Sequence, residues 1–196
     1  MSARPRISLG FSVRTGRAFI VALSGAPDAP AIRAKTLVQI AFTFEEGAVF
    51  HAAEELPLAA ARKLVTSAEA RFAKKATRGL REFVDTLDGE IVVAAMAAKP
   101  EKPAPPLEST LKAHTLIHAA EGELYRRVYA AAASELGFEV ARISPDAVTE
   151  EIASALELAP ASVTARLAAI GKASGKPWAA DQKKAALAAW WALARK

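Results

Sequence analysis

Apolar and polar side chains alternate over the first part of the chain. From Ile7 to Val13 every second residue is apolar, with serine or glycine between, and this period of two is typical of a strand with one buried face. A turn containing Gly16 separates this segment from a second apolar run, which favours a tight hairpin. The pattern predicts strands over residues 5–13, 18–23 and 32–42.

The apolar spacing then changes to that of amphipathic helices. After Pro57, apolar residues recur every three or four positions, and Gly89 is placed to cap the C-terminus of the helix. A second long helix is predicted from a cap at Ser109 or Thr110 to Leu136. The chain therefore has two helices long enough to cover a sheet.

The remaining segments complete an α/β pattern. Residues 90–96 and 138–143 are short apolar runs, as expected of parallel strands that are covered on both faces. Residues 99–106 contain four prolines and predict a stiff connector within the domain. From about residue 146 to 196 the chain is predicted to be helical, with the last helix beginning near Ala180.

The opening hairpin, Leu9 to Gly16, resembles that of RuvC-type resolvases and their YqgF-like relatives in the RNase H-like superfamily. The order of predicted elements also resembles an RNase H-like domain over nearly the whole chain. This resemblance implies an α/β fold with a mixed five-stranded sheet, whose first three strands are antiparallel, flanked by long helices. It implies one domain over residues 1–196, with residues 146–196 as its C-terminal helical segment.

The same resemblance bears on catalysis. These resolvases cut nucleic acid with carboxylates that hold two divalent metal ions, and their first-strand Asp stands where this chain has Ser12. No acid follows the apolar run of residues 92–96, and Asp181 alone lies where a carboxylate of the closing helix is expected. A hydroxyl is a poor ligand for a hard cation. We therefore expect the fold without its two-metal nuclease activity, and Ser12 and Asp181 remain candidate catalytic residues.

The charge balance favours a polyanionic partner, and ordinary surface charge is the alternative. The formal net charge is +5 and the pI about 9.6, which favours contact with nucleic acid. One side of the first long helix is strongly basic, and the alternative is a solvated surface whose long stems cover apolar area. The candidate nucleic-acid-binding residues are Arg62, Lys63, Arg71, Lys74, Lys75 and Arg78.

The absence of cysteine excludes disulfides, thiolate nucleophiles and zinc knuckles. One face of the second long helix carries three polar residues at i, i+4 and i+7, which are His114, His118 and Glu121. These residues are candidates for an acid–base site or a divalent metal site. Thr115 excludes the zinc protease motif, which requires Glu directly after the first His. The alternative is that these imidazoles and the carboxylate form hydrogen bonds beside the sheet and have only a structural role. The loop with His51 is expected near the same sheet edge as these candidates, Ser12 and Asp181.

Two functions follow from these candidates. The first is an RNase H-like module that binds nucleic acid or a protein partner without two-metal cleavage. The alternative is a metal-assisted hydrolase that uses His114, His118 and Glu121, joined by Asp181. A homodimer is a third possibility if Trp190 and Trp191 are exposed.

No apolar run is long enough to span a membrane, so a cytoplasmic location is expected. The sequence assigns neither the substrate nor the oligomeric state.

Overall fold

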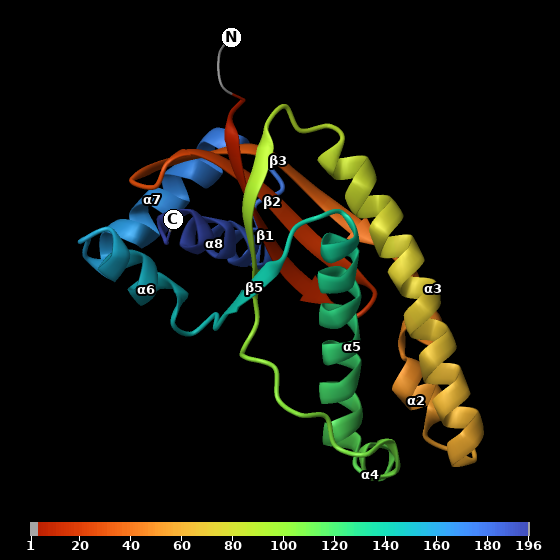
Figure 1. The fold of residues 1–196 in the computed structure, drawn as a ribbon. Helices are drawn as coiled ribbons and strands as arrows, with labels where there is room; N and C mark the ends of the chain where they lie inside the picture. Colours follow the sequence, from red (N-terminus) through yellow and green to blue (C-terminus); the bar gives the residue numbers. More distant parts are fainter. Residues whose placement is uncertain (1–3, 196) are drawn as a thin grey trace.

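A mixed five-stranded sheet forms the centre of the molecule (Figure 1). This computed structural model describes residues 4–195. The strand order is β3-β2-β1-β4-β5, in which β1, β2 and β3 are antiparallel and β4 and β5 run parallel to β1. The strands are β1 (Arg6–Arg14), β2 (Arg17–Ala26), β3 (Ala29–Gln39), β4 (Glu90–Ala97) and β5 (Val140–Ile143). The predicted RNase H-like arrangement of strands is confirmed.

Helices cover both faces of this sheet. The long helices α3 and α5 lie on one face, and α6, α7 and α8 lie on the other (Figure 1). The helices are α1 (Phe44–Gly47), α2 (Val49–Ala53), α3 (Leu58–Val84), α4 (Leu107–Leu111), α5 (His114–Glu135), α6 (Val148–Ala155), α7 (Pro160–Ser174) and α8 (Ala180–Ala194). None of these helices is long and apolar enough to cross a bilayer.

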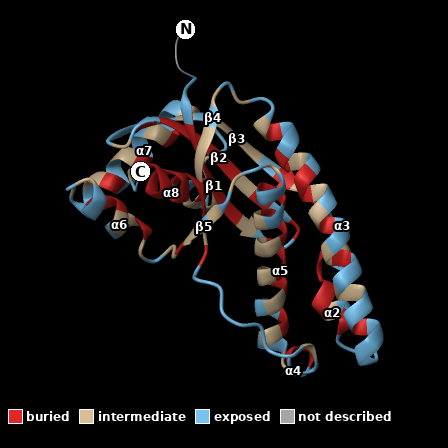
Figure 2. Cartoon of the chain, viewed as in Figure 1, coloured by how far each residue is buried: buried red, intermediate tan, exposed pale blue. Residues whose placement is uncertain are grey.

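The alternation in β1 separates two hydrophobic cores. Its apolar residues, such as Leu9 and Phe11, are buried in the core beneath α3 and α5, and Figure 2 shows this buried interior. Its small residues face α8: the Ser8 hydroxyl donates to Ala189 O at 2.6 Å, and a Cβ added at Gly10 would lie 1.8 Å from Ala185 O. Because these side chains are small, α8 packs directly on the strand.

The closing helix belongs to the second core. Trp190 and Trp191 are both buried there. The Trp190 indole donates to Pro27 O at 2.7 Å, and the Trp191 indole donates to Glu151 at 2.6 Å. The condition that would have favoured a dimer surface on α8, exposed tryptophans, is therefore not met.

Several element boundaries differ from those predicted. The first long helix ends at Val84 rather than near Gly89, where the Thr86 hydroxyl donates to Phe83 O at 2.7 Å and satisfies a terminal carbonyl. The predicted second helix is divided, because Ala113 is extended between α4 and α5. The segment predicted as a loop around His51 forms α1 and α2.

Candidate nucleic-acid interface and histidine cluster

The carboxyl end of β1 meets the first turn of α8. The buried Ser12 hydroxyl donates to Asp181 Oδ1 at 3.0 Å. Arg14, two residues further along β1, donates to the same oxygen from Nε at 3.0 Å, and its Nη2 lies 2.9 Å away. Ser12 and Asp181 are thus brought together as expected, whereas Arg14 was not anticipated from the sequence. A guanidinium neutralises the carboxylate at this edge of the sheet.

The neighbouring strand offers no acid at this edge. β4 ends at Ala97, and Ala98 and Lys99 follow. The Lys99 ammonium lies 3.4 Å from Asp146, and both side chains are largely exposed. Near their carboxyl ends, at residues 12–14 and 94–99, the two central strands therefore carry a serine and no carboxylate.

Three histidines meet on the other side of the sheet, among the elements packed around α5. His51 comes from α2, and His114 and His118 come from the first turns of α5. One ring nitrogen from each of the three lies within 4.8 Å of the others, and the Nε2 atoms of His114 and His118 are 3.0 Å apart. The ring of His51 lies 4.8 Å from that of His118, centroid to centroid. The arrangement is a compact cluster of three imidazoles.

The third predicted member of this group, Glu121, lies behind His51. Its side chain is only 5% exposed, and Oε1 accepts from the backbone N–H groups of Phe50 at 3.1 Å and His51 at 3.4 Å. Its Oε2 lies 3.0 Å from Nδ1 of His51. Glu121 therefore holds the α2 segment against α5 and is not one of the three clustered groups. No hydrogen bond or ion pair within residues 4–195 joins this cluster to Ser12 or Asp181.

Two tyrosines on α5 attach β3 and the segment that follows it to this helix. The Tyr125 hydroxyl donates to Gly47 O at 2.9 Å, and the Tyr129 hydroxyl donates to Val38 O at 2.7 Å. Burial raises the pKa of both phenols well above the ordinary value. Both groups therefore stay protonated and act as structural donors.

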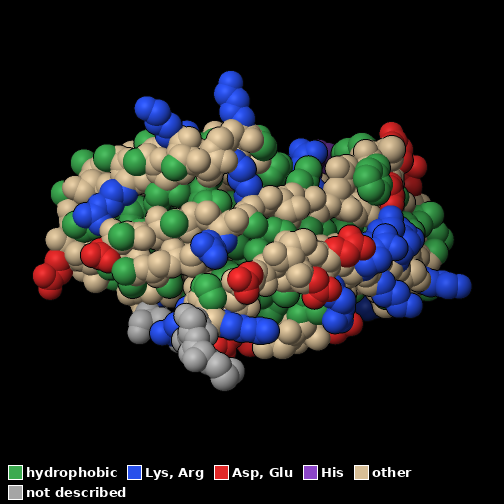
Figure 3. Space-filling model, turned by 90° about the horizontal axis from the view of Figure 1, so that it is seen from above, with side chains coloured by type: hydrophobic (Ala, Val, Ile, Leu, Met, Phe, Trp, Pro, Cys, Tyr) green, Lys and Arg blue, Asp and Glu red, His purple; other side chains and the backbone are tan. Residues whose placement is uncertain are grey.

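The basic residues of α3 do not form one continuous surface. Five exposed cations fall within an arc of about 80° at 100° per residue, and we call them the α3 basic stripe. They are Lys63, Arg71, Lys74, Arg78 and Arg81. Within the described chain only Arg78 of these has an ion pair, with Glu82 at 4.0 Å. Figure 3 shows Lys and Arg side chains gathered on the side of the molecule where α3 lies.

Lys75 differs from the other predicted nucleic-acid contacts. Its ammonium donates to Glu46 at 2.6 Å and to Ile40 O at 3.0 Å. The hydrogen bond from Lys75 also lowers the pKa of Glu46, and the backbone N–H of Phe42 adds to the effect. Lys75 thus fastens α1 to α3 and is not a free cation.

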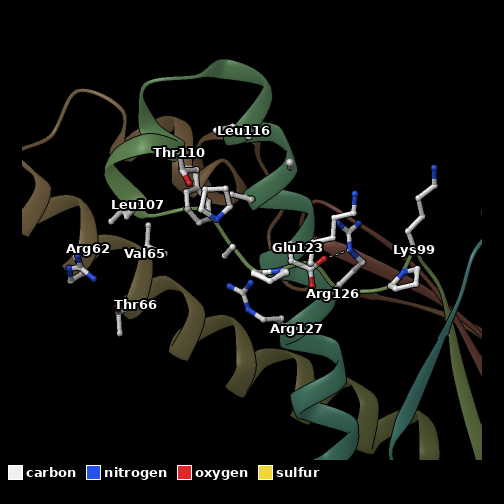
Figure 4. A pocket seen from close by; sticks show the side chains of 18 residues that line it. Arg62, Val65, Thr66, Lys99, Leu107, Thr110, Leu116, Glu123, Arg126 and Arg127 are labelled. Atoms are coloured by element: carbon white, nitrogen blue, oxygen red, sulfur yellow. Dashed lines mark hydrogen bonds and ion pairs between the residues drawn. The ribbon is translucent and has the colours of Figure 1, made fainter.

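Arg62 lies on another side of α3 and borders a groove between α3, the proline-rich connector and α5 (Figure 4). The groove has a volume of about 750 Å³ and an apolar floor that includes Val65 and Leu116. One acid, Glu123, lines it, and Arg126 and Arg142 neutralise that carboxylate at 2.9 and 2.5 Å. The cations that line the groove are Arg62, Lys99, Lys102, Arg126 and Arg127.

Comparison with known proteins identifies the fold. The structure is similar to Thermus thermophilus RuvC in complex with Holliday junction substrate, with a TM-score of 0.55 and 13% identity over 95% of this chain and 91% of that chain. A second Thermus thermophilus RuvC structure gives a TM-score of 0.52 and 11% identity over 94% and 91% of the two chains. No family model and no curated protein matches the sequence. The likeness covers 94–95% of this chain, so the chain has the RNase H-like fold of RuvC.

Proposed function

We propose that the protein is an RNase H-like module that binds DNA, with branched DNA as its preferred substrate class, and that it does not cut DNA by two-metal chemistry. The observation that carries the proposal is the α3 basic stripe, whose five cations are exposed and almost free of acidic partners. Such cations gain by releasing the counterions condensed on a phosphate backbone. The structurally similar RuvC forms a complex with a Holliday junction substrate, which supports the choice of branched DNA.

The dimensions of the stripe suit a phosphate backbone. From Lys63 to Arg81 the helix rises about 27 Å at 1.5 Å per residue. Phosphates on one strand of a duplex are spaced by about 3.4 Å along the axis, so the stripe can follow or cross one backbone. The groove beside Arg62 adds further cations on the adjoining side of α3.

The carboxyl end of β1 supports binding without two-metal cleavage. In the resolvases that the hairpin resembles, an Asp stands at the position of Ser12. Here the Ser12 hydroxyl and the Arg14 guanidinium both engage Asp181 Oδ1. Two divalent cations at this place would have to displace a guanidinium and would find one carboxylate, which is too few hard oxygen ligands.

We expect no cleavage of a labelled four-way junction in Mg²⁺ or Mn²⁺, because the carboxylate that meets the end of β1, Asp181 of α8, is neutralised by Arg14. The products are resolved by denaturing electrophoresis. The variant Asp181→Asn provides the control for a contaminating nuclease. Metal-dependent cleavage that is lost in Asp181→Asn would overturn this part of the proposal.

One exposed aromatic residue lies beside the stripe. Phe42 is 70% exposed and lines a shallow hollow with Lys75 and Arg78. Exposed aromatic rings next to cations stack on unpaired bases, each worth about 1–3 kcal/mol. The Phe42 ring therefore gives the surface a means of preferring open or branched DNA.

We expect Phe42→Ala to weaken binding of single-stranded DNA about tenfold, because a stacked base loses its aromatic partner. Binding of a fully paired duplex is expected to change by less than about threefold, since its bases are already stacked. Both affinities are measured by fluorescence anisotropy. Leu37→Ala is the matched control, because it removes an exposed apolar side chain from the same hollow. Equal losses on both DNA forms would contradict a stacking role.

The proposal as a whole is tested by titrating the protein against a four-way junction, a duplex and a single strand over a series of salt concentrations. Five phosphate contacts on duplex DNA predict a slope of log K against log salt of about −4.5. The junction is expected to bind more tightly than the duplex. Absence of binding to all three at low salt would reject the proposal and favour a protein partner for the basic surface.

A further inference from the structure

We propose that His51, His114 and His118 bind one divalent transition-metal ion of the zinc class, with a fourth coordination position open to solvent. The three ring nitrogens already lie within 4.8 Å of one another, although the residues come from two separate helices. Imidazole nitrogen is a preferred ligand of zinc, copper, iron and nickel. The site is separate from the Ser12–Asp181 pair and independent of the proposed DNA binding.

The geometry is close to that of a bound ion. Zinc binds imidazole nitrogen at about 2.0–2.1 Å, which separates two tetrahedral ligands by about 3.4 Å. The Nε2 atoms of His114 and His118 are 3.0 Å apart, so small side-chain rotations bring both to bonding distance. His114 and His118 are one turn apart on α5, and paired histidines at i and i+4 are a common helical arrangement for zinc.

Glu121 supports the third ligand. Glu121 is 4% exposed, and its carboxylate is anchored by the backbone N–H groups of Phe50 and His51. Nδ1 of His51 lies 3.0 Å from Oε2, off the line of a good hydrogen bond, and a small ring rotation completes that bond. A proton on Nδ1 leaves Nε2 as the nitrogen that binds metal. A carboxylate behind a ligating histidine is the common means of fixing its tautomer and orientation.

The ligand count leaves one position free. Among residues 4–195, the clustered group contains three histidines and no carboxylate. The side chains of His114 and His118 are exposed, so water reaches the ion. Three protein ligands and one open position describe a site that binds an exchangeable ligand, in contrast to the closed four-ligand sites of structural zinc. The ion would also fasten α2 to the start of α5.

Zinc binding is tested on untagged, chelator-treated protein by calorimetric titration with Zn²⁺ and by the visible spectrum with Co²⁺. We expect one ion per chain, a tetrahedral Co²⁺ spectrum and a Tm that rises by roughly 5–10 °C at a free Zn²⁺ concentration 100-fold above Kd. His114→Ala is expected to lower the affinity at least 100-fold. The exposed position of His114 means that this variant folds.

Glu121→Gln separates the supporting role from a ligand role. It keeps an oxygen to accept from Phe50 and is expected to retain one site with an affinity 10–100-fold lower. Glu108→Gln is the matched control, because it neutralises an exposed acid on the nearby α4, and it is expected to leave zinc affinity unchanged. Binding well below one ion per chain, or binding unaffected by His114→Ala, would overturn the proposal. DNA affinity of the histidine variants is expected to match the wild type, which separates this test from that of the proposed function.

Discussion

Replacement of Lys63, Lys74 and Arg81 by glutamine is expected to weaken duplex DNA binding several-hundred-fold at about 0.1 M salt. Each phosphate contact contributes about 0.9 to the salt slope, so three contacts contribute about 2.7. If these contacts contribute nothing to the affinity at 1 M salt, their loss lowers the affinity about 500-fold at 0.1 M salt. All three side chains are exposed and have no ion pair within the described chain, so the folded structure is expected to be unaffected. Anisotropy titrations at several salt concentrations measure both the affinity and the slope.

The matched control replaces three exposed lysines on the α7 and α8 side of the sheet, Lys172, Lys176 and Lys183. It removes the same total charge from a face that we do not assign to DNA. We expect a change of less than about fivefold, with the wild-type salt slope. Equal losses in both triple variants would mean that net charge alone attracts the DNA, and the assignment of the α3 basic stripe would fail.

Gly10→Ala is expected to destabilise the protein by about 3 kcal/mol, at the upper end of the cost of overpacking a core. A Cβ at this position would lie 1.8 Å from Ala185 O and 2.5 Å from Ala189 N. Both neighbours are backbone atoms of α8, so the helix must move away from β1. The displacement also separates Asp181 from Ser12. Denaturant unfolding measures the loss, as a lower midpoint at an unchanged m value.

Gly122→Ala provides the comparison for this variant. Gly122 lies within α5, and an added Cβ would meet the flexible end of the Arg126 side chain at 3.3 Å. Because alanine favours helix over glycine by about 1 kcal/mol, we expect a neutral or stabilising effect. If Gly10→Ala instead destabilised by less than about 1 kcal/mol, the close packing of α8 on β1 would be refuted.

The sheet and the closing helix were predictable because the information is local. Alternation in β1 marks its two faces, and the same alternation places Ser12 toward α8. The start of α8 near Ala180 was predicted correctly. The spacing of His114 and His118 likewise places both on one side of α5, because a helix has a fixed repeat.

The remaining features depend on contacts between residues distant in sequence. His51 joins the histidine cluster because Glu121, 70 residues away in the chain, holds its backbone. Lys75 is tied to Glu46 across a separation of 29 residues, and Arg14 reaches Asp181 across 167. Composition and periodicity do not predict such pairings. The correct group of clustered histidines and the correct set of free cations therefore required the structure.

The central claim, that DNA lies along the α3 basic stripe, is tested most directly by lysine footprinting on the bound protein. The protein is acetylated with and without saturating four-way junction, and modification is quantified by mass spectrometry. We predict several-fold protection of Lys63 and Lys74, and unchanged modification of Lys172, Lys176 and Lys183. Protection confined to the second group, or equal protection of both groups, would contradict the account.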